Sequence, residues 1–192
     1  MKTKLNLMFA GAAALAVCLF FPSHGTAQDA ATNHIAPAPV TPAPAAAATM
    51  TNVLLKFVRA DSEETAGEDG KGANAVDGKP DTFWHTQWQD ANPLPPHEIV
   101  FELFPPTTIK GFTYLPRQDD SVNGMIKGYE FYVSNDGQDF GKPVAKGEFA
   151  EGKELKTVSF DPQVCRFIKL KALSEINGEA WTSAAEIGVV PQ

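Results

Sequence analysis

The sequence is poor in cysteine, which limits how the fold can be held together. It has only two cysteines among 192 residues, and Cys18 lies in an apolar N-terminal run that we expect to be removed. Cys165 then has no intrachain partner, which excludes the disulfide framework that stabilises many small domains. The fold must therefore rely on a hydrophobic core, with or without a bound metal.

Positive charge is also scarce. Lys and Arg total 16 against 23 Asp and Glu, for a formal net charge of -7, and there are only three arginines, Arg59, Arg117 and Arg166. Proteins that bind nucleic acid usually neutralise phosphates with a basic surface. We therefore expect no nucleic-acid partner.

The common catalytic motifs are missing as well. The sequence has no GxSxG, HExxH, Walker A or CxxC pattern, and beyond residue 51 its only histidines are His85 and His97. Its carboxylates are numerous, but their spacing singles out no catalytic pair. We expect a protein that is not an enzyme. A very small glycan hydrolase is a remaining alternative, which turnover of aryl glycosides would reveal.

The N-terminal residues have the layout of a secretory signal peptide. Two lysines precede an apolar run from Leu5 to Phe21, and Gly25 and Ala27 supply the small side chains needed for cleavage. Residues 1–27 are thus predicted to be removed after Ala27. The apolar run of about 17 residues is marginal for a membrane anchor, and Val17 is too bulky for a lipoprotein signal at Cys18.

Residues 28–51 are rich in alanine and proline and offer no large apolar side chain to bury. This composition predicts a semi-extended linker. We therefore expect a protein that is secreted, periplasmic or at the cell surface, without membrane insertion after signal cleavage.

The rest of the chain alternates between apolar and polar residues. No stretch keeps a helical period of 3.6 residues for a dozen positions, whereas residues 97–104, 129–134 and 165–173 have a period of two, typical of half-buried strands. Turn signals such as Pro105-Pro106 and Asn123-Gly124 lie between such segments. The expected core positions are Ile99, Phe101, Leu103, Tyr129, Phe131, Val133, Ile168, Leu170 and Ala172. Residues 52–192 are thus predicted to form one all-β sandwich.

All three tryptophans fall in segments predicted to be loops. Trp84 follows Phe83 and is expected to be a buried plug of the sandwich. Trp88 and Trp181 have polar neighbours, which suits the stacking of a sugar ring on an indole as much as burial.

Three polar residues near these loops could bind a sugar, and each has a simpler structural interpretation. His85 could be satisfied by backbone groups, Arg117 could pair with Asp119 or Asp120, and Asn123 could serve only to form a turn before Gly124. Sequence alone leaves both interpretations open for each residue.

The segment ANAVDGKPDTFW indicates a cation loop. Asp77 supplies charge, Gly78 permits a tight reversal, and Thr82 offers a hydroxyl and a carbonyl, the hard ligands that calcium prefers. The segment lacks the EF-hand pattern, so further ligands must come from elsewhere in the chain.

The strings GANAVDGKPDTFWHTQW, PPHEIVFEL, GFTYLPRQD, NGMIKGYEFYVSNDG and RFIKLKALSEINGEAWTSAAEI occur in this order. Together they resemble the discoidin domain (coagulation factor 5/8 type C), and specifically carbohydrate-binding module family 32, over about residues 53–190. The resemblance implies a jelly-roll β-sandwich whose termini lie close together, a structural calcium and a shallow sugar site on loops at one end.

The resemblance also assigns residues to these two sites. It implies calcium ligation by the carbonyls of Asn74, Lys79 and Ala185, the side chains of Asp77 and Glu186, and both groups of Thr82. It implies a galactose site formed by His85, Arg117 and Asn123, an aromatic platform from Trp88 or Trp181, and a loop carboxylate. Glu68 is the expected carboxylate, although Glu63, Glu64 or Asp69 could take its place.

We therefore expect a secreted, non-catalytic module that binds glycans with terminal galactose or N-acetylgalactosamine, with a separate glycan-active enzyme as a candidate partner. The alternative is an adhesion or assembly protein that uses the same sandwich for protein or anionic-lipid contacts. The acidic composition argues against lipid binding, because such domains use basic residues and exposed apolar side chains.

Overall fold

The computed structural model describes residues 53–192. The predicted signal peptide, its cleavage after Ala27 and the linker of residues 28–51 lie outside the described residues, so these boundaries stay predictions. In chain order the elements are β1 (Leu54–Ala60), the 3-10 helix η1 (Gly72–Val76), β2 (Trp84–His85), β3 (His97–Leu115), β4 (Gly128–Ser134), β5 (Ala145–Glu148), β6 (Lys156–Ala172), β7 (Ser183–Ala184) and β8 (Glu186–Pro191).

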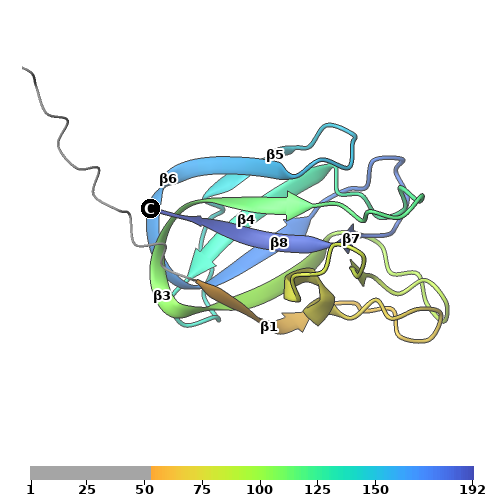
Figure 1. The fold of residues 1–192 in the computed structure, drawn as a ribbon, viewed down its shortest axis with the longest axis horizontal. Coiled ribbons are helices and arrows are strands. Elements are labelled where there is room, and N and C mark those ends of the chain that lie inside the picture. Colours follow the sequence, from red (N-terminus) through yellow and green to blue (C-terminus); the bar gives the residue numbers. More distant parts are fainter. Residues whose placement is uncertain (1–52) are drawn as a thin grey trace, which may run out of the picture. The chain divides into compact units, whose positions relative to one another are not determined.

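Two long strands, β3 and β6, build both layers of a β-sandwich. The first part of β3 pairs with β1 and with the last part of β6, which continues to β4 and β5. The second part of β3 pairs with β8 and with the first part of β6. Both long strands curve at the same end of the domain, as Figure 1 shows. The prediction of an all-β, jelly-roll sandwich is confirmed.

The bend in β3 corrects one sequence-based expectation. The sequence predicts a turn between strands at Pro105-Pro106, but the chain stays extended through both prolines. The pairing with β6 is irregular between Glu102 and Thr107. Proline has no N–H to donate to a β-ladder. The two prolines therefore lie where β3 bends and its pairing with β6 is interrupted, and the strand continues in the other layer without reversing.

The alternating pattern correctly predicts the core. The six positions expected in β3 and β6 are all buried, as are Tyr129 and Phe131 of β4, while Val133 packs against them partly buried. Phe112 stacks on Phe131 with ring centroids 4.1 Å apart. These rings belong to opposite layers, so the core joins the two halves of the sandwich.

Trp84 is buried, as predicted, and its indole N–H donates to the Ser62 carbonyl at 2.8 Å. The side chain therefore closes one end of the core.

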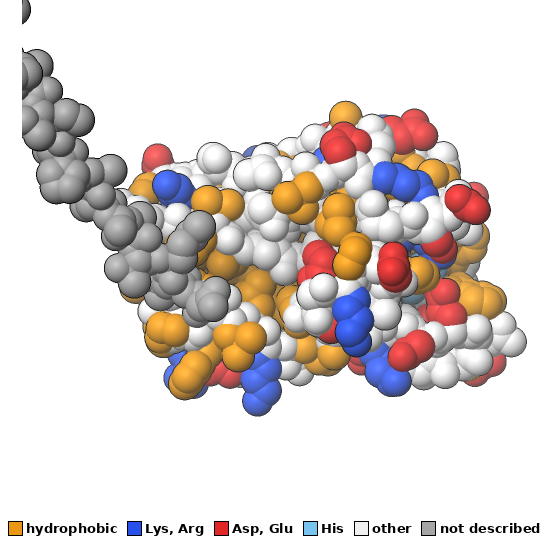
Figure 2. Space-filling model, viewed as in Figure 1, with side chains coloured by type: hydrophobic (Ala, Val, Ile, Leu, Met, Phe, Trp, Pro, Cys, Tyr) orange, Lys and Arg blue, Asp and Glu red, His pale blue; other side chains and the backbone are white. Residues whose placement is uncertain are grey.

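β1 begins and β8 ends at the same end of the sandwich, and residues from both strands line a common groove. The described chain ends are thus close together. Within residues 53–192, no helix is long and apolar enough to cross a membrane. Figure 2 shows acidic and basic side chains interspersed over the visible face of the domain.

Candidate functional site

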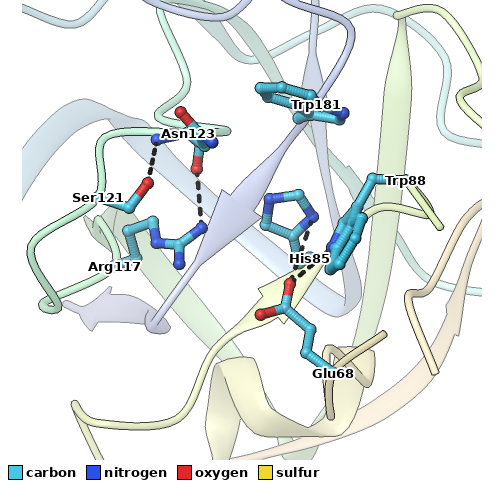
Figure 3. A pocket seen from close by; sticks show the side chains of 7 residues that line it. All are labelled: Glu68, His85, Trp88, Arg117, Ser121, Asn123 and Trp181. Carbon is cyan, nitrogen blue, oxygen red and sulfur yellow. Dashed lines mark hydrogen bonds and ion pairs between the residues drawn. The ribbon is translucent and has the colours of Figure 1, made fainter. Parts of the chain in front are cut away.

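The loops at the end of the domain opposite the chain ends form a pocket of about 260 Å³. Two short strands place His85 in the pocket, because β2 pairs with β7 through Trp84 with Ala184 and His85 with Ser183. This pairing brings His85 beside the loop that carries Trp181. The pocket is lined by Glu68, His85, Trp88, Arg117, Ser121, Asn123 and Trp181 (Figure 3).

The structure thus brings together all six residues assigned to the sugar site by the resemblance. It also distinguishes among the acidic residues of the first loop, because Glu68 lines this pocket whereas Glu63, Glu64 and Asp69 do not. The role of the six pocket residues in sugar binding stays a prediction, which the geometry below supports.

Arg117 is 7% exposed, and its guanidinium is held from several sides. Nε and Nη2 donate to the two carboxylate oxygens of Asp119 at 2.7 and 2.5 Å, and Nη1 donates to the Asn123 carbonyl at 3.3 Å. The guanidinium also lies 4.2 Å from the centre of the Phe83 ring. Arg117 therefore pairs with Asp119, as one interpretation predicted, and also lines the pocket. The ion pair fixes the guanidinium at the pocket wall.

The same contact affects Asp119. Its hydrogen bond with Arg117 lowers the pKa of this carboxyl, although desolvation opposes the shift. Asp119 therefore stays ionised and keeps the guanidinium in place, although it does not line the pocket itself.

His85 is buried, and its Nδ1 lies 2.7 Å from the Thr86 carbonyl. Burial lowers the pKa of His85, so the imidazole is neutral at neutral pH, and a contact with a carbonyl requires the proton to be on Nδ1. Nε2 is then an acceptor, with no hydrogen-bond partner within residues 53–192. The predicted backbone contact is present, and the other ring nitrogen remains available for a ligand hydroxyl.

Two indoles flank this imidazole, as Figure 3 shows. Trp88 is 39% exposed, and its Nε1 donates to Glu68 Oε1 at 3.0 Å. The ring centres of Trp181 and His85 are 6.5 Å apart. Trp181 Nε1 is buried without a hydrogen-bond partner among the described residues. The pocket therefore combines aromatic surfaces with a cation, an imidazole and amide groups.

Asn123 combines the two roles considered for it. Gly124 has a φ of 82°, a left-handed conformation that favours glycine, so the pair does form a turn. The Asn123 carbonyl accepts from Arg117 and from Ser183 Oγ at 3.0 Å. Its side-chain amide makes no hydrogen bond to any described residue and belongs to the pocket lining.

The sequence did not indicate Ser121 or Lys153. Ser121 lines the pocket and its Oγ accepts from the Asn123 N–H at 3.1 Å. Lys153 reaches this loop from a distant part of the chain and donates to the carbonyls of Asp119 and Ser121. Neither residue belongs to a recognisable motif, because the contacts depend on how separate loops meet in the fold.

Three of the expected cation ligands, Asp77, Lys79 and Thr82, contact one another. Thr82 Oγ1 lies 2.9 Å from Asp77 Oδ2 and 3.0 Å from the Lys79 carbonyl, and the Lys79 N–H donates to Asp77 Oδ1 at 2.9 Å. Glu186 is close enough for the charge of Asp77 to act on it. Asn74 lies in η1, just before Asp77, and Ala185 directly precedes Glu186.

Glu186 tests whether these residues fit a cation. Its Oε1 is buried and has no hydrogen-bond partner among residues 53–192. Burial raises the pKa of Glu186, and the charge of Asp77 raises it further. Two adjacent carboxylates, one with an orphaned oxygen, suit a hard divalent cation. The described residues contain no group of three or more His, Cys, Asp or Glu side chains suited to a metal, and the expected set has only two such side chains.

The fold and the pocket are those of a β-sandwich with a candidate ligand site on the loops at one end. Comparisons with known proteins identify the family. The F5/8 type C domain model matches residues 58–187. The chain belongs to this family, also called the discoidin family, and its similar solved structures are family 32 carbohydrate-binding modules.

Two of these structures contain sugars. The Clostridium perfringens module CpGH89CBM32-5, solved in complex with GalNAc-β-1,3-galactose, is 37% identical with a TM-score of 0.64, covering 71% of this chain and 94% of that one. The family 32 module of C. perfringens NanJ, solved with galactose, is 32% identical with a TM-score of 0.60, covering 70% and 92%.

Similar curated proteins include enzymes. Galactose oxidase of Gibberella zeae is 39% identical over 133 residues, which is 69% of this chain and 19% of the oxidase. A sialidase of Micromonospora viridifaciens is 42% identical over 139 residues, which is 72% of this chain and 21% of the sialidase. The chain thus spans about a fifth of the length of these relatives.

Proposed function

We propose that this protein is a secreted, non-catalytic carbohydrate-binding module that recognises terminal galactose or N-acetylgalactosamine and carries a structural calcium. The observation that supports it most is the convergence of Arg117, His85 and Asn123 on one pocket flanked by two indoles. The ligands in the similar C. perfringens structures, galactose and GalNAc-β-1,3-galactose, support the same sugar class.

The geometry suits a galactose-type ring. Its axial 4-hydroxyl can donate to His85 Nε2 and accept from the guanidinium of Arg117, while the apolar face of the ring stacks on Trp88 or Trp181. The hydroxyls can also reach the amide of Asn123. An open site of this kind binds weakly, with a Kd on the order of 0.1–1 mM.

A binding role without catalysis accounts for the carboxylates near the pocket. Glu68 accepts the indole N–H of Trp88, and Asp119 accepts from Nε and Nη2 along one edge of the Arg117 guanidinium. Each carboxylate is thereby committed to the position of a neighbouring side chain. A glycan-active enzyme acting on the same glycan is a natural partner for such a module.

Asp77, Glu186 and Thr82, together with the carbonyls of Asn74, Lys79 and Ala185, would hold the calcium. The ion would neutralise the two carboxylates and link the loop after η1 to β8. Its contribution would be to stability, because this cluster and the sugar pocket have no lining residue in common.

A glycan array probed with the purified protein tests the proposed function. We expect signals on glycans that end in galactose or N-acetylgalactosamine, and loss of those signals in the presence of free galactose. Binding to no glycan, or only to glycans without these termini, would refute the specificity. Release of product from aryl glycosides would refute the non-catalytic role.

A further inference from the structure

A buried carboxylate bonded to the backbone of a pocket residue is not used by the proposed sugar contacts. Glu64 is fully buried and does not line the pocket. Oε1 accepts from the N–H groups of Ala66 and Gly67, both at 2.8 Å. Oε2 accepts from the N–H groups of Trp88 and Gln89 at 2.7 and 2.8 Å. One side chain thus joins two loops that are more than 20 residues apart.

Hydrogen bonds from the N–H of Trp88 and from the other three amides that donate to Glu64 lower the pKa of this carboxyl to about 2. Burial acts in the opposite direction. The carboxylate is therefore ionised at physiological pH and can act only as an acceptor. All four hydrogen bonds have the geometry of good charge-assisted bonds.

The main chain of Glu64 reinforces the connection. Its N–H donates to the His85 carbonyl at 2.8 Å, and its carbonyl accepts from the Gly70 N–H at 2.8 Å. Gly70 in turn accepts from the His85 N–H at 3.0 Å. The backbone of His85, a residue of the pocket, is therefore hydrogen-bonded to the same loop that contains Glu64.

The loop held by Glu64 packs directly against the Trp88 ring. A Cβ built on Gly67 would lie 2.6 Å from Cη2 and 2.7 Å from Cζ2 of this indole, far inside normal contact distance. The next residue, Glu68, accepts the indole N–H. Trp88 is thus fixed at its backbone by Glu64, along its ring by Gly67 and at its nitrogen by Glu68, although the side chain is partly exposed.

We infer that Glu64 is a positioning residue for the sugar platform: it holds the two loops that fix the Trp88 ring, and so controls sugar affinity without touching the sugar. The inference rests on the proposed function for its effect on sugar binding. A platform held in its bound orientation loses little conformational freedom when the sugar stacks on it.

Two variants of the full chain test this inference. Glu64→Gln keeps the size of the side chain but places an NH₂ group against N–H donors, so at least one of the hydrogen-bonded pairs is lost. Gly67→Ala leaves Glu64 intact and forces the Trp88 ring to move. Glu63→Gln is a matched control, because Glu63 also accepts a backbone N–H, from Gly72 at 2.6 Å, but makes no hydrogen bond to the Trp88 loop among the described residues.

Two measurements are made on each variant. Titration with methyl β-galactoside gives the affinity, and the indole N–H signal of Trp88 in a ¹H–¹⁵N spectrum, assigned with Trp88→Phe, reports the ring's hydrogen bond and its exchange with water. We expect Glu64→Gln and Gly67→Ala to weaken binding on the order of ten-fold and to shift and accelerate exchange of this signal. We expect Glu63→Gln to match the wild type in both.

The results separate the two proposals. Unchanged affinity and an unchanged indole signal in a folded Glu64→Gln protein would overturn the positioning role. If Glu64→Gln does not fold, unchanged affinity in a folded Gly67→Ala protein whose Trp88 signal has shifted would overturn the link between the position of the ring and sugar affinity. If the wild type binds no galactoside but both variants still alter the Trp88 signal, the proposed sugar function is wrong, whereas the positioning of Trp88 by Glu64 is upheld.

Discussion

Removal of the Arg117 side chain should abolish measurable galactoside binding and leave the domain folded. Among residues 53–192, the guanidinium is the only cationic group that lines the pocket, and it is oriented by Asp119, Asn123 and Phe83. Loss of one charged hydrogen bond typically costs roughly 1.5–3 kcal/mol, which is roughly a 10- to 140-fold change in Kd. A Kd of about 0.5 mM would then become roughly 5–70 mM.

The fold should survive because the partner left behind can reach water. The Asp119 side chain is 45% exposed, and an ion pair with such an exposed member contributes little to stability. We therefore expect Arg117→Ala to melt within a few degrees of the wild type. Calorimetric titration with methyl β-galactoside, preceded by a thermal melt of each protein, measures both effects.

Asp119→Asn is the matched control, since it keeps the guanidinium and removes the carboxylate that orients it. We expect affinity between that of the wild type and that of Arg117→Ala. If a folded double variant with Arg117→Ala and His85→Ala still binds galactose or N-acetylgalactosamine, the sugar site has been placed on the wrong loops.

Three further predictions concern the metal, the pH dependence and the start of the exported chain. A chelator should lower the melting temperature by several degrees and excess calcium should restore it, because a ligand at about 100 times its Kd stabilises the native state by about 2.7 kcal/mol; a melting curve of Asp77→Ala that still responds to chelator would contradict this site. Burial lowers the pKa of His97, but its hydrogen bond and charge interaction with Asp61 outweigh burial and raise it overall. Protonated His97 should therefore add to the free energy of unfolding. This contribution is complete below pH about 6.5 and is lost as pH rises through the folded pKa of His97. Denaturant titrations of wild type and Asp61→Asn should show this pH dependence only in the wild type. Mass spectrometry of exported protein should find Gln28 as the first residue, and an intact N-terminus or a lipid-modified cysteine would refute the predicted cleavage.

The period-two pattern predicts the strands and their inner faces because burial of alternate side chains is a local property of the sequence. The behaviour of Pro105-Pro106 is not local in this sense. Whether two prolines end a strand or only bend it depends on the partners on either side, and β3 has strands along both halves.

The pocket residues could be predicted only through resemblance to a family, since nothing in their spacing brings His85 next to Trp181. Glu64 shows a further limit. From sequence it is one of several acidic residues in a polar loop, with Glu68 as the expected pocket residue. Its buried position depends on backbone N–H groups from a loop more than 20 residues away, and such donors leave no trace in the side-chain pattern.

The short pairing of β2 with β7, and the position of Glu186 at the start of β8, make both candidate sites depend on the last segment of the chain. Trp181 lines the pocket, and Glu186 supplies the second carboxylate of the proposed calcium site. A polypeptide truncated before residue 181 would retain His85, Arg117 and Asp77 and still lack a finished site of either kind. Under the proposed function, retention on a galactose resin would therefore separate intact protein from C-terminally truncated products during purification.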